Sequence, residues 1–166
     1  DIKISLETFV PSPATTPGRM NLFNFKNFQV LVDYAHNAHG LEAIGKFVER
    51  VEATVKVGVI AGVGDRRDDD IRDIGRLAAK MFDEIIIRQD KNLRGRSDQE
   101  IIKLIQEGIN SIDASKKTIV IPKEKEAIDY VIKNAVKGSF ITICLDTVPD
   151  VLQMIMQYKE QEDSGA

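Results

Sequence analysis

Short apolar runs rich in valine and isoleucine alternate along this chain with longer stretches in which apolar residues recur every three or four positions. The first pattern is typical of buried strands and the second of amphipathic helices. We expect strands over residues 29–34, 55–61, 84–88, 117–122 and 139–145. We expect the helices that follow them over residues 41–51, 71–81, 97–105, 123–136 and 147–157.

Successive strand–helix units with strands this apolar indicate strands that are buried on both faces. The pattern therefore predicts an α/β fold: a Rossmann-like, mostly parallel sheet of about six strands with helices on both faces. Residues 2–9 and 20–25 resemble additional strands, which we expect to lie antiparallel at the N-terminal edge of the sheet. The stretch between them, residues 11–18, is rich in proline and threonine and is expected to be a turn-rich linker.

The length of 166 residues corresponds to one domain. We expect residues 1–18 to be a linker and edge strand from a missing upstream domain, residues 19–160 to form the α/β domain, and residues 161–166 to be a frayed tail. The chain begins at Asp1 rather than at methionine. We therefore expect that it is processed or is part of a longer chain.

The formal net charge is −3, from 23 Lys and Arg against 26 Asp and Glu. General nucleic-acid and membrane-surface binders are usually basic, so this balance argues against both kinds of partner. No apolar run approaches the roughly 20 residues that a membrane span needs. The single cysteine, Cys144, permits no internal disulfide, which favours a reducing, cytoplasmic location. Cys144 lies in an apolar run and is expected to pack in the core.

The chemistry-bearing residues follow three of the expected strands. Ligands of open parallel sheets bind beyond the carboxyl ends of the strands, so the loops after those ends are the places to search. Residues 33–40, 62–67 and 88–96 hold both histidines, several arginines and three loop carboxylates. We expect these loops to meet at one rim of the sheet.

The first of these loops places an acid at a strand end and an imidazole and an amide just before a helix. Asp33 suits a ribose hydroxyl, His36 suits a phosphate, and the helix N-terminus favours anions. Alternatively, Asp33 and Asn37 are turn and cap residues and His36 is incidental. A metal site built from Asp33, His36 and His39 is a further alternative, although this spacing fits no standard zinc pattern.

The second loop combines glycines that allow close backbone approach with Asp65 and Arg66, whose charges suit an anionic or polar ligand. The third loop carries Asp90, Arg94 and Arg96, which suit a substrate with an anionic group and an ammonium or guanidinium group. For both loops the alternative is a tight turn with solvated surface charges.

Residues 40–46 match a phosphate-loop pattern up to its last position, where Phe47 replaces the required Ser or Thr. This stretch also carries the apolar spacing of a helix. We therefore expect helix here and no phosphate loop in this chain.

Residues 16–23, 32–37 and 62–66 together resemble the C-terminal domain of the Mur-type ATP-dependent amide ligases, which include peptidoglycan-precursor ligases and folylpolyglutamate synthases. Within that family, residues 61–67 and 88–96 are most similar to the cyanophycin synthetases, which polymerise aspartate and arginine. The resemblance covers about residues 16–110. Two departures are Ala38, where the family usually has proline, and a third loop that differs from the Asp-Asn-Pro-Arg loop of related ligases.

The resemblance implies a mechanism in which ATP, with Mg²⁺, phosphorylates a carboxylate and an incoming amine attacks the acyl phosphate. It implies that the phosphate loop and the metal ligands lie on a preceding central ATPase domain, which is missing here, so this chain alone would be inactive. The C-terminal domain would close over the nucleotide. Within a cyanophycin synthetase, this half of the enzyme would add arginine to an aspartate β-carboxylate.

Carried over residue by residue, the resemblance implies that Arg19 reaches the nucleotide phosphates, Asp33 holds the ribose, and His36 with Asn37 lies beside the nucleotide. The incoming amino acid or polymer end would be bound by Asp90, Arg94 and Arg96, and by Asp65 and Arg66 of the second loop. No metal ligand and no catalytic residue is expected in this chain itself. We expect any homo-oligomer to form through the full-length enzyme. The alternative function is a stand-alone, non-catalytic module of the same fold that binds a nucleotide or a partner.

Overall fold

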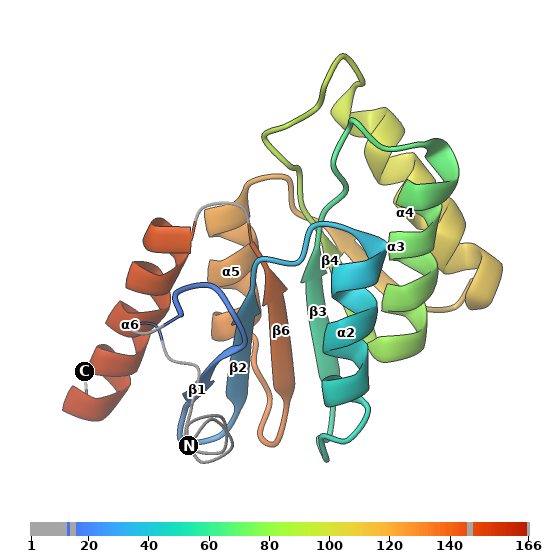
Figure 1. Ribbon diagram of the computed structural model, residues 1–166. Helices are drawn as coiled ribbons and strands as arrows, with labels where there is room; N and C mark the ends of the chain where they lie inside the picture. The colour runs from blue at the N-terminus through green and yellow to red at the C-terminus, as the bar shows by residue number, and fades with distance from the viewer. Residues whose placement is uncertain (1–12, 14–15, 146–147, 166) are drawn as a thin grey trace, which may run out of the picture.

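The computed structural model describes residues 13, 16–145 and 148–165, and all structural statements concern these residues. They form an α/β domain in which strands and helices alternate after an initial hairpin (Figure 1). The elements are β1 (Asn21–Asn24), β2 (Gln29–Asp33), α2 (Ala38–Val48), β3 (Lys56–Ile60), α3 (Asp68–Met81), β4 (Glu84–Ile87), α4 (Asp98–Ile112), β5 (Lys117–Val120), α5 (Glu124–Lys133), β6 (Phe140–Cys144) and α6 (Val148–Ser164).

The strands form one six-stranded sheet in the order β1-β2-β6-β3-β4-β5. Strand β1 pairs antiparallel with β2, and every other neighbouring pair is parallel. The expected fold class is confirmed, including an antiparallel N-terminal edge strand within residues 20–25. The other expected edge strand, residues 2–9, lies outside the described part of the chain.

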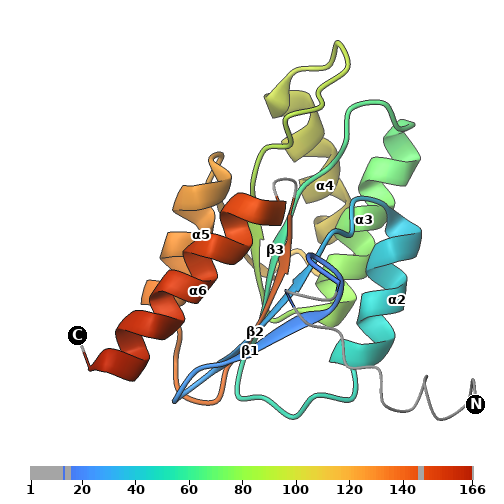
Figure 2. The same ribbon diagram turned by 60° about the vertical axis from the view of Figure 1, so that its left-hand side comes forward.

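Helices cover both faces of the sheet, which explains why the strands are apolar without alternation. Helices α2, α3 and α4 lie on one face, and α5 and α6 lie on the other (Figures 1 and 2). In β6, Phe140 and Cys144 belong to the first core, while Ile141 and Ile143 belong to the second. Cys144 is buried and packs in the core, as expected.

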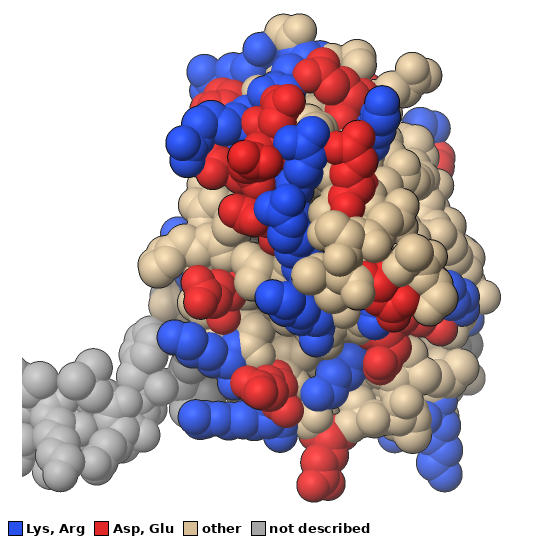
Figure 3. Space-filling view, turned by 90° about the vertical axis from the view of Figure 1, so that its right-hand side faces the viewer, with Lys and Arg blue, Asp and Glu red and all other residues tan. Residues whose placement is uncertain are grey.

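Helices α3 and α4 pack with their backbones in contact. A Cβ atom on Gly75 would lie 2.2 Å from the carbonyl oxygen of Ile105, and one on Gly108 would lie 2.0 Å from that of Arg72. On the outer side of this pair, acidic and basic side chains are interleaved (Figure 3), and Arg72 Nε lies 2.8 Å from Glu107 Oε2. The close approach of the two helices holds the loops that precede them side by side.

Helix α6 extends further than the sequence suggested. It runs through Ser164, so the expectation of a frayed tail is wrong for residues 161–164. Both carboxylate oxygens of Glu162 accept the backbone N–H of Lys26, each at 3.0 Å, and the Lys159 ammonium lies 5.9 Å from the centroid of the Phe25 ring. These contacts fasten the helix end to the β1–β2 hairpin. No helix within the described residues has the length and apolarity of a membrane span.

Candidate functional site

The three chemistry-bearing loops leave the same edge of the sheet, which we call the carboxyl edge. They follow β2, β3 and β4 at the upper side of the sheet in Figure 1. Strand β6 lies between β2 and β3, and the helix that leaves β6 lies on the opposite face from the helices that leave its neighbours. Such a reversal is a topological switch point, where open α/β sheets bind their ligands.

Asp33 ends β2 at this switch point. Its side chain is 8% exposed, and Oδ2 accepts the backbone N–H of Met20 at 2.9 Å. Burial raises the pKa of Asp33 above its ordinary value, and the Met20 N–H and the charge of Arg19 oppose that shift. The carboxyl group therefore fixes the loop before β1 at the carboxyl edge.

Asn21 organises the same loop and was not singled out in the sequence. The residue is fully buried; its Oδ1 accepts the N–H of Gly18 at 2.7 Å, and its Nδ2 donates to the carbonyl oxygens of Thr16 at 2.9 Å and Arg19 at 3.1 Å. Gly18 O in turn accepts the N–H of Tyr34 at 2.7 Å. The signal in the sequence was a polar residue at a buried position of the expected edge strand.

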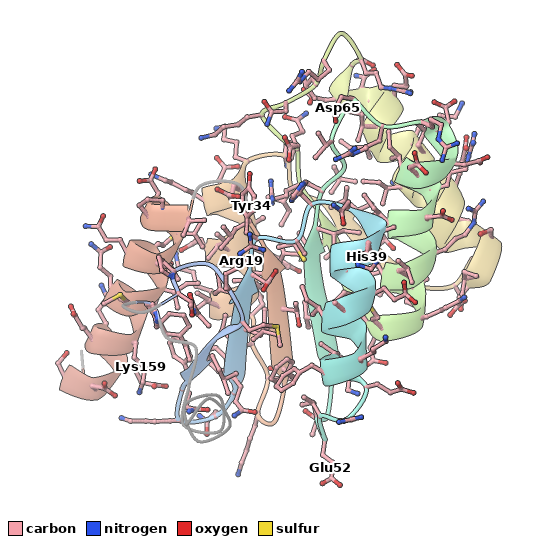
Figure 4. The ribbon with its side chains drawn as sticks, viewed as in Figure 1. Arg19, Tyr34, His39, Glu52, Asp65 and Lys159 are labelled. Atoms are coloured by element: carbon pink, nitrogen blue, oxygen red, sulfur yellow. The ribbon has the colours of Figure 1, made fainter. Side chains whose placement is uncertain are left out.

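Arg19 is held at the carboxyl end of β2 by this loop. Its backbone carbonyl is bound by Asn21, while its side chain is exposed. Figure 4 shows Arg19 and Tyr34 close together at the end of β2, with His39 on helix α2. The charge of Arg19 acts on the Asp33 carboxyl group, so the structure brings these two residues together at the carboxyl edge.

Asn37 is the N-cap of α2, because its Oδ1 accepts the N–H of Gly40 at 2.8 Å. The alternative interpretation of Asn37 as a helix cap is therefore correct for its Oδ1 atom. His36 Nδ1 lies 3.3 Å from Tyr34 O, and the two rings are 5.2 Å apart. Among the described residues, no three His, Cys, Asp or Glu side chains are grouped to hold a metal ion, so the metal site that would use His36 and His39 is not supported. Residues 40–46 are helical, as expected.

Arg96 joins the second and third loops. Its Nε donates to Gly64 O at 3.1 Å and its Nη2 to Arg66 O at 2.9 Å. Its Nη1 lies 2.7 Å from a carboxylate oxygen of Asp68 and 2.7 Å from one of Glu100. All three guanidinium nitrogens of Arg96 therefore contact the protein and position the two loops. The substrate contact that the resemblance implies for Arg96 stays a prediction.

The backbones of the same two loops also touch. The N–H of Gly64 donates to Asn92 O at 2.9 Å, and a Cβ atom on Gly64 would lie 1.8 Å from the carbonyl oxygen of Leu93. Only glycine permits this approach. Asp90 is 7% exposed, and its Oδ1 accepts the N–H of Asn92 at 2.7 Å, so the buried carboxyl group shapes the loop from inside.

The remaining candidate residues of these loops are exposed. Arg94 has a φ of +48° and is followed by Gly95 with a φ of +85°, so the chain turns sharply and presents Arg94 to solvent. Asp65 and Arg66 lie on the second loop, with Oδ1 and Nε 3.8 Å apart. Figure 4 places Asp65 well above Arg19, so the structure separates the second loop's charges from the Asp33 region.

Arg88 is a residue of this edge that sequence reasoning missed. Its side chain is 2% exposed; Nε and Nη2 donate to Cys144 O at 3.1 and 2.7 Å, and Nη1 donates to Gln89 O at 3.1 Å. Nη2 also lies 3.5 Å from Glu124 Oε2. One buried guanidinium therefore ties the ends of β4 and β6 to the start of α5. An arginine directly after an apolar strand was the available signal.

A hollow of about 450 Å³ opens beside Arg88, between the third loop and the start of α5. Charges of both signs line this mixed-charge hollow: Asp90, Lys91, Lys123, Glu124 and Asp150. Such a lining can pair with a ligand that carries both an ammonium and a carboxylate group.

Residues 18–144 match the family described as the Mur ligase, glutamate ligase domain. The chain belongs to this family. The resemblance inferred from the loops is therefore confirmed, and the match extends well beyond residue 110.

Among curated relatives of this Mur ligase domain, the cyanophycin synthetase of Crocosphaera subtropica is 41% identical over 155 residues, covering 93% of the chain and 18% of that enzyme. The cyanophycin synthetase of Geminocystis herdmanii is 40% identical over 157 residues, covering 95% and 18%. A UDP-N-acetylmuramoyl-L-alanyl-D-glutamate–2,6-diaminopimelate ligase of Caldanaerobacter subterraneus is 34% identical over 118 residues, covering 71% and 24%. The chain thus spans less than a fifth of the cyanophycin synthetases it matches.

Solved structures share the fold of this Mur ligase domain. A 2,6-diaminopimelate ligase of the same name superposes with a TM-score of 0.67 at 23% identity, over 81% of this chain and 26% of that one. Escherichia coli FolC in complex with ADP superposes with a TM-score of 0.67 at 18% identity, over 90% and 34%. At these identities the comparisons show the fold alone.

Proposed function

We propose that this domain belongs to a cyanophycin synthetase-like ligase, closes over ATP bound to a separate central domain, and positions an incoming amino acid. The observation that carries the proposal is the convergence of the Arg19 loop, Asp33 and the start of α2 at the topological switch point. It occurs in a chain that is 41% identical to a cyanophycin synthetase over 93% of its length.

The nucleotide half of the proposal rests on the chemistry around Asp33. The exposed guanidinium of Arg19 suits phosphate oxygens, and the Asp33 carboxyl suits a ribose hydroxyl. The N-terminus of α2, flanked by His36 and Asn37, favours an anion. Related structures support the choice of ligand, because FolC was solved with ADP and a Yersinia pestis relative with AMPPNP and manganese.

The divalent cation is a separate matter. ATP is ordinarily used with Mg²⁺, which prefers several oxygen ligands. The described residues contain no group of three acidic or histidine side chains that fits such an ion. In nucleotide sites Mg²⁺ usually keeps several waters and is held by one or two carboxylates together with the phosphates, so this observation does not locate the ion. We assign this chain the ribose and phosphate contacts and, following the family resemblance, we assign the metal and the phosphate loop to another domain.

The amino-acid half of the proposal rests on the third loop and the mixed-charge hollow. Carboxylates such as Asp150 suit an ammonium or guanidinium group, and cations such as Lys123 suit a carboxylate. Arg94, on the exposed turn of the third loop, is a further candidate for a carboxylate. Asp65 and Arg66 remain candidates for a longer substrate, such as a polymer end. In the ligation, the amine nitrogen forms a bond to the acyl carbon, the C–O bond to phosphate breaks, phosphate leaves with the electron pair, and the amine loses a proton.

A chimera tests the function of the intact site. The matching segment of the Crocosphaera enzyme is replaced by this chain, and ATP-dependent incorporation of arginine is measured. We expect activity in the chimera, and a loss of about 10-fold or more in ATP turnover on Arg19→Ala or Asp33→Asn without a fall in Tm. Arg76→Ala, on the outer side of α3, is the matched control and should leave turnover unchanged. Normal turnover in both site variants would refute the assignment.

A titration of the chain alone separates the proposal from its alternative. Mg·ATP is added to the ¹⁵N-labelled chain, and amide shifts are followed by NMR. We expect weak binding, with shifts concentrated in residues 16–20 and 33–40, because half of a site offers few contacts. Tight, saturable binding by the chain alone would instead favour the stand-alone nucleotide-binding module.

A further inference from the structure

The two halves of the proposed site lie on different strands of the carboxyl edge. Asp33 ends β2, whereas the mixed-charge hollow is lined by residues that follow β4 and β5. In the sheet order, β6 and β3 stand between β2 and β4. Two reactants combine fast only when the groups that hold them keep a fixed separation. The connection between β4 and β2 across these two strands therefore bears on the reaction.

Arg88 spans the first part of this gap. Its backbone N–H donates to Ile60 O of β3 at 2.9 Å. Its guanidinium reaches past the end of β3 to Cys144 O at the end of β6, with Nε at 3.1 Å and Nη2 at 2.7 Å. The side chain is 2% exposed. Hydrogen bonds from a charged donor that is shielded from water are among the stronger ones in proteins, so this link is firm.

One peptide group carries the contact on to β2. The carbonyl oxygen of Cys144 accepts from Arg88, and the N–H on the other side of the same peptide bond, that of Leu145, donates to Asp33 O at 3.1 Å. A peptide group is planar and rigid, so its oxygen and its N–H move together. The backbone of Asp33 is thus joined to the Arg88 guanidinium through a single rigid unit.

The same guanidinium also holds the wall of the mixed-charge hollow. Nη1 donates to Gln89 O at 3.1 Å, and Nη2 lies 3.5 Å from Glu124 Oε2. Gln89 and Glu124 both line the hollow, and the N–H of Gln89 donates to Pro122 O at 2.9 Å. Arg88 itself is not among the lining residues. It therefore contacts the supports of both half-sites and the surface of neither.

We propose that Arg88 is a positioning residue for the ligation, which sets the separation between the nucleotide contacts at Asp33 and the amino-acid hollow. This inference rests on the proposed function. Each half-site keeps its own ligand contacts when Arg88 is changed, so binding of either substrate alone is preserved. A displacement of about 1 Å between reacting groups can cost about 100-fold in rate, so the effect falls on kcat.

Arg88→Lys in the chimera described above tests the effect on the reaction. Lysine keeps the positive charge, but its ammonium group is a point charge that cannot reproduce the fork of donors to Cys144, Gln89 and Glu124. We expect kcat for arginine incorporation to fall about 10-fold or more. We expect KM for ATP and KM for arginine to change less than about 3-fold, because the ligand contacts remain.

Phe82→Leu is the control for a loss of stability alone. Phe82 is 2% exposed, lies at the end of α3 and packs over Gly58 of β3, away from the carboxyl edge. The substitution removes core packing and should lower the Tm. Assayed at a temperature where both variants are folded, Phe82→Leu should keep the kcat of the unmodified chimera. A purely structural role of Arg88 would not produce this difference.

Hydrogen exchange tests the link without substrate or chimera. In the 166-residue chain, Arg88→Lys should accelerate exchange of the Leu145 amide about 10-fold relative to the Ile86 amide in the middle of β4, because the end of β6 loses its anchor. Phe82→Leu should leave the ratio of the two rates unchanged. NMR on the ¹⁵N-labelled chain measures both rates.

Three results would overturn the proposal: an unchanged kcat in Arg88→Lys, an equal loss of kcat in Phe82→Leu, or an unchanged exchange ratio at Leu145. The Arg19→Ala and Asp33→Asn variants of the same chimera judge the proposed function separately. If those two variants lose ATP turnover while Arg88→Lys keeps its kcat, only the inference about Arg88 fails. Normal turnover in both would remove the proposed function itself.

Discussion

Asn21 shows how one buried amide can fix a ligand-binding loop. Its three hydrogen bonds hold the backbone on both sides of Arg19, and in this conformation the Met20 N–H of the same loop donates to Asp33. The cost of burying the amide is offset only while every bond is made. Arg19 and Asp33, which would contact the nucleotide, therefore depend for their position on Asn21, which would not contact it.

Replacing Asn21 by alanine should loosen this loop. We expect Asn21→Ala to lower the free energy of unfolding by about 2–3 kcal/mol, because several backbone groups lose a buried partner. Urea unfolding followed by circular dichroism measures the change. Asn24→Ala, on the exposed side of the same strand, is the control and should cost less than about 1 kcal/mol. Equal effects would show that the amide network is unimportant.

Asp33 should give a distinctive dependence of stability on pH. Burial raises its pKa above the ordinary value of 3.8, so the protonated acid favours the folded state. That contribution is fully present below the unfolded value and is lost as the pH rises through the raised pKa. Asp33→Asn carries no charge, so we expect its Tm to exceed that of the unmodified chain at pH 7 and the difference to vanish below about pH 4.

Thermal unfolding between pH 3 and pH 8 checks this expectation. Asp65→Asn removes an exposed carboxylate from the neighbouring loop and serves as the control, with a profile like that of the unmodified chain. An Asp33→Asn variant less stable than the unmodified chain at pH 7 would contradict the interpretation. Asp33→Asn is also expected to impair ATP turnover. The native Asp33 would then lower the stability of the domain at pH 7 while supporting its function.

The helices and strands act as rigid holders for the loops. Helices α3 and α4 touch through Gly75 and Gly108, and this contact sets the two loops that Arg96 joins. On the other side of the edge, Arg88 connects β4, β6 and α5. The contact between α3 and α4 and the hydrogen bonds of Arg88 both position loop residues by joining elements that are far apart in the chain.

Gly108→Ala tests the helix contact. The added methyl group would meet the backbone of Arg72, and backbone atoms do not give way as the end of a side chain does. We expect a loss of about 1–3 kcal/mol in the free energy of unfolding, despite the higher helix propensity of alanine. Asn110→Ala, at an exposed position of the same helix, is the control and should be neutral or slightly stabilising. A neutral Gly108→Ala would show that the helices can separate without cost.

Arg88→Met tests the link between β4 and β6. The variant keeps an apolar stem but removes the donors to Cys144 O and leaves Glu124 without this cation, so we expect a loss of about 3 kcal/mol. Arg76→Met removes an arginine that pairs at the surface with Asp73 and should cost less than about 1 kcal/mol. Urea unfolding measures both. Similar losses would mean that Arg88 is held no more firmly than a surface arginine.

At the scale of the whole molecule, the edge of the sheet where the parallel strands end differs in chemistry from the edge where they begin. The carboxyl edge gathers charged loops, and the opposite edge, where the parallel strands begin, has a hollow lined by both apolar and polar side chains. The central strand β6, buried on both faces, reaches both edges and carries Cys144 at its end. The reactivity of the Cys144 thiol can therefore be used to detect unfolding of the domain.

Cys144 should react only when the domain unfolds. Burial raises the pKa of its thiol to about 12, and the side chain is 3% exposed, so the reactive thiolate is both scarce and shielded. We expect labelling by an aromatic disulfide reagent to be slow in buffer and to increase with urea in parallel with the loss of circular dichroism. Glutathione at the same urea concentrations is the control for reagent chemistry. Rapid labelling without urea would show local opening at the end of β6.

Much of this molecule was predictable from the order of residues alone. The apolar runs and the helical spacing located every strand and helix of the parallel part, because local periodicity reflects which side of an element is buried. The loops at 33–40, 62–67 and 88–96 were found because they interrupt that periodicity with glycines and charges. Family membership also followed from residues that lie close together in sequence.

What the sequence did not reveal are relations between residues distant in the chain. The insertion of β6 between β2 and β3, the clamp of Arg88 on Cys144 O, the joining of two loops by Arg96 and the anchoring of Glu162 at Lys26 all depend on which elements become neighbours. Sequence alone determined the elements, because their pattern is local; tertiary structure decided the partners of the polar groups, because burial and hydrogen bonding are settled only when the whole chain has packed.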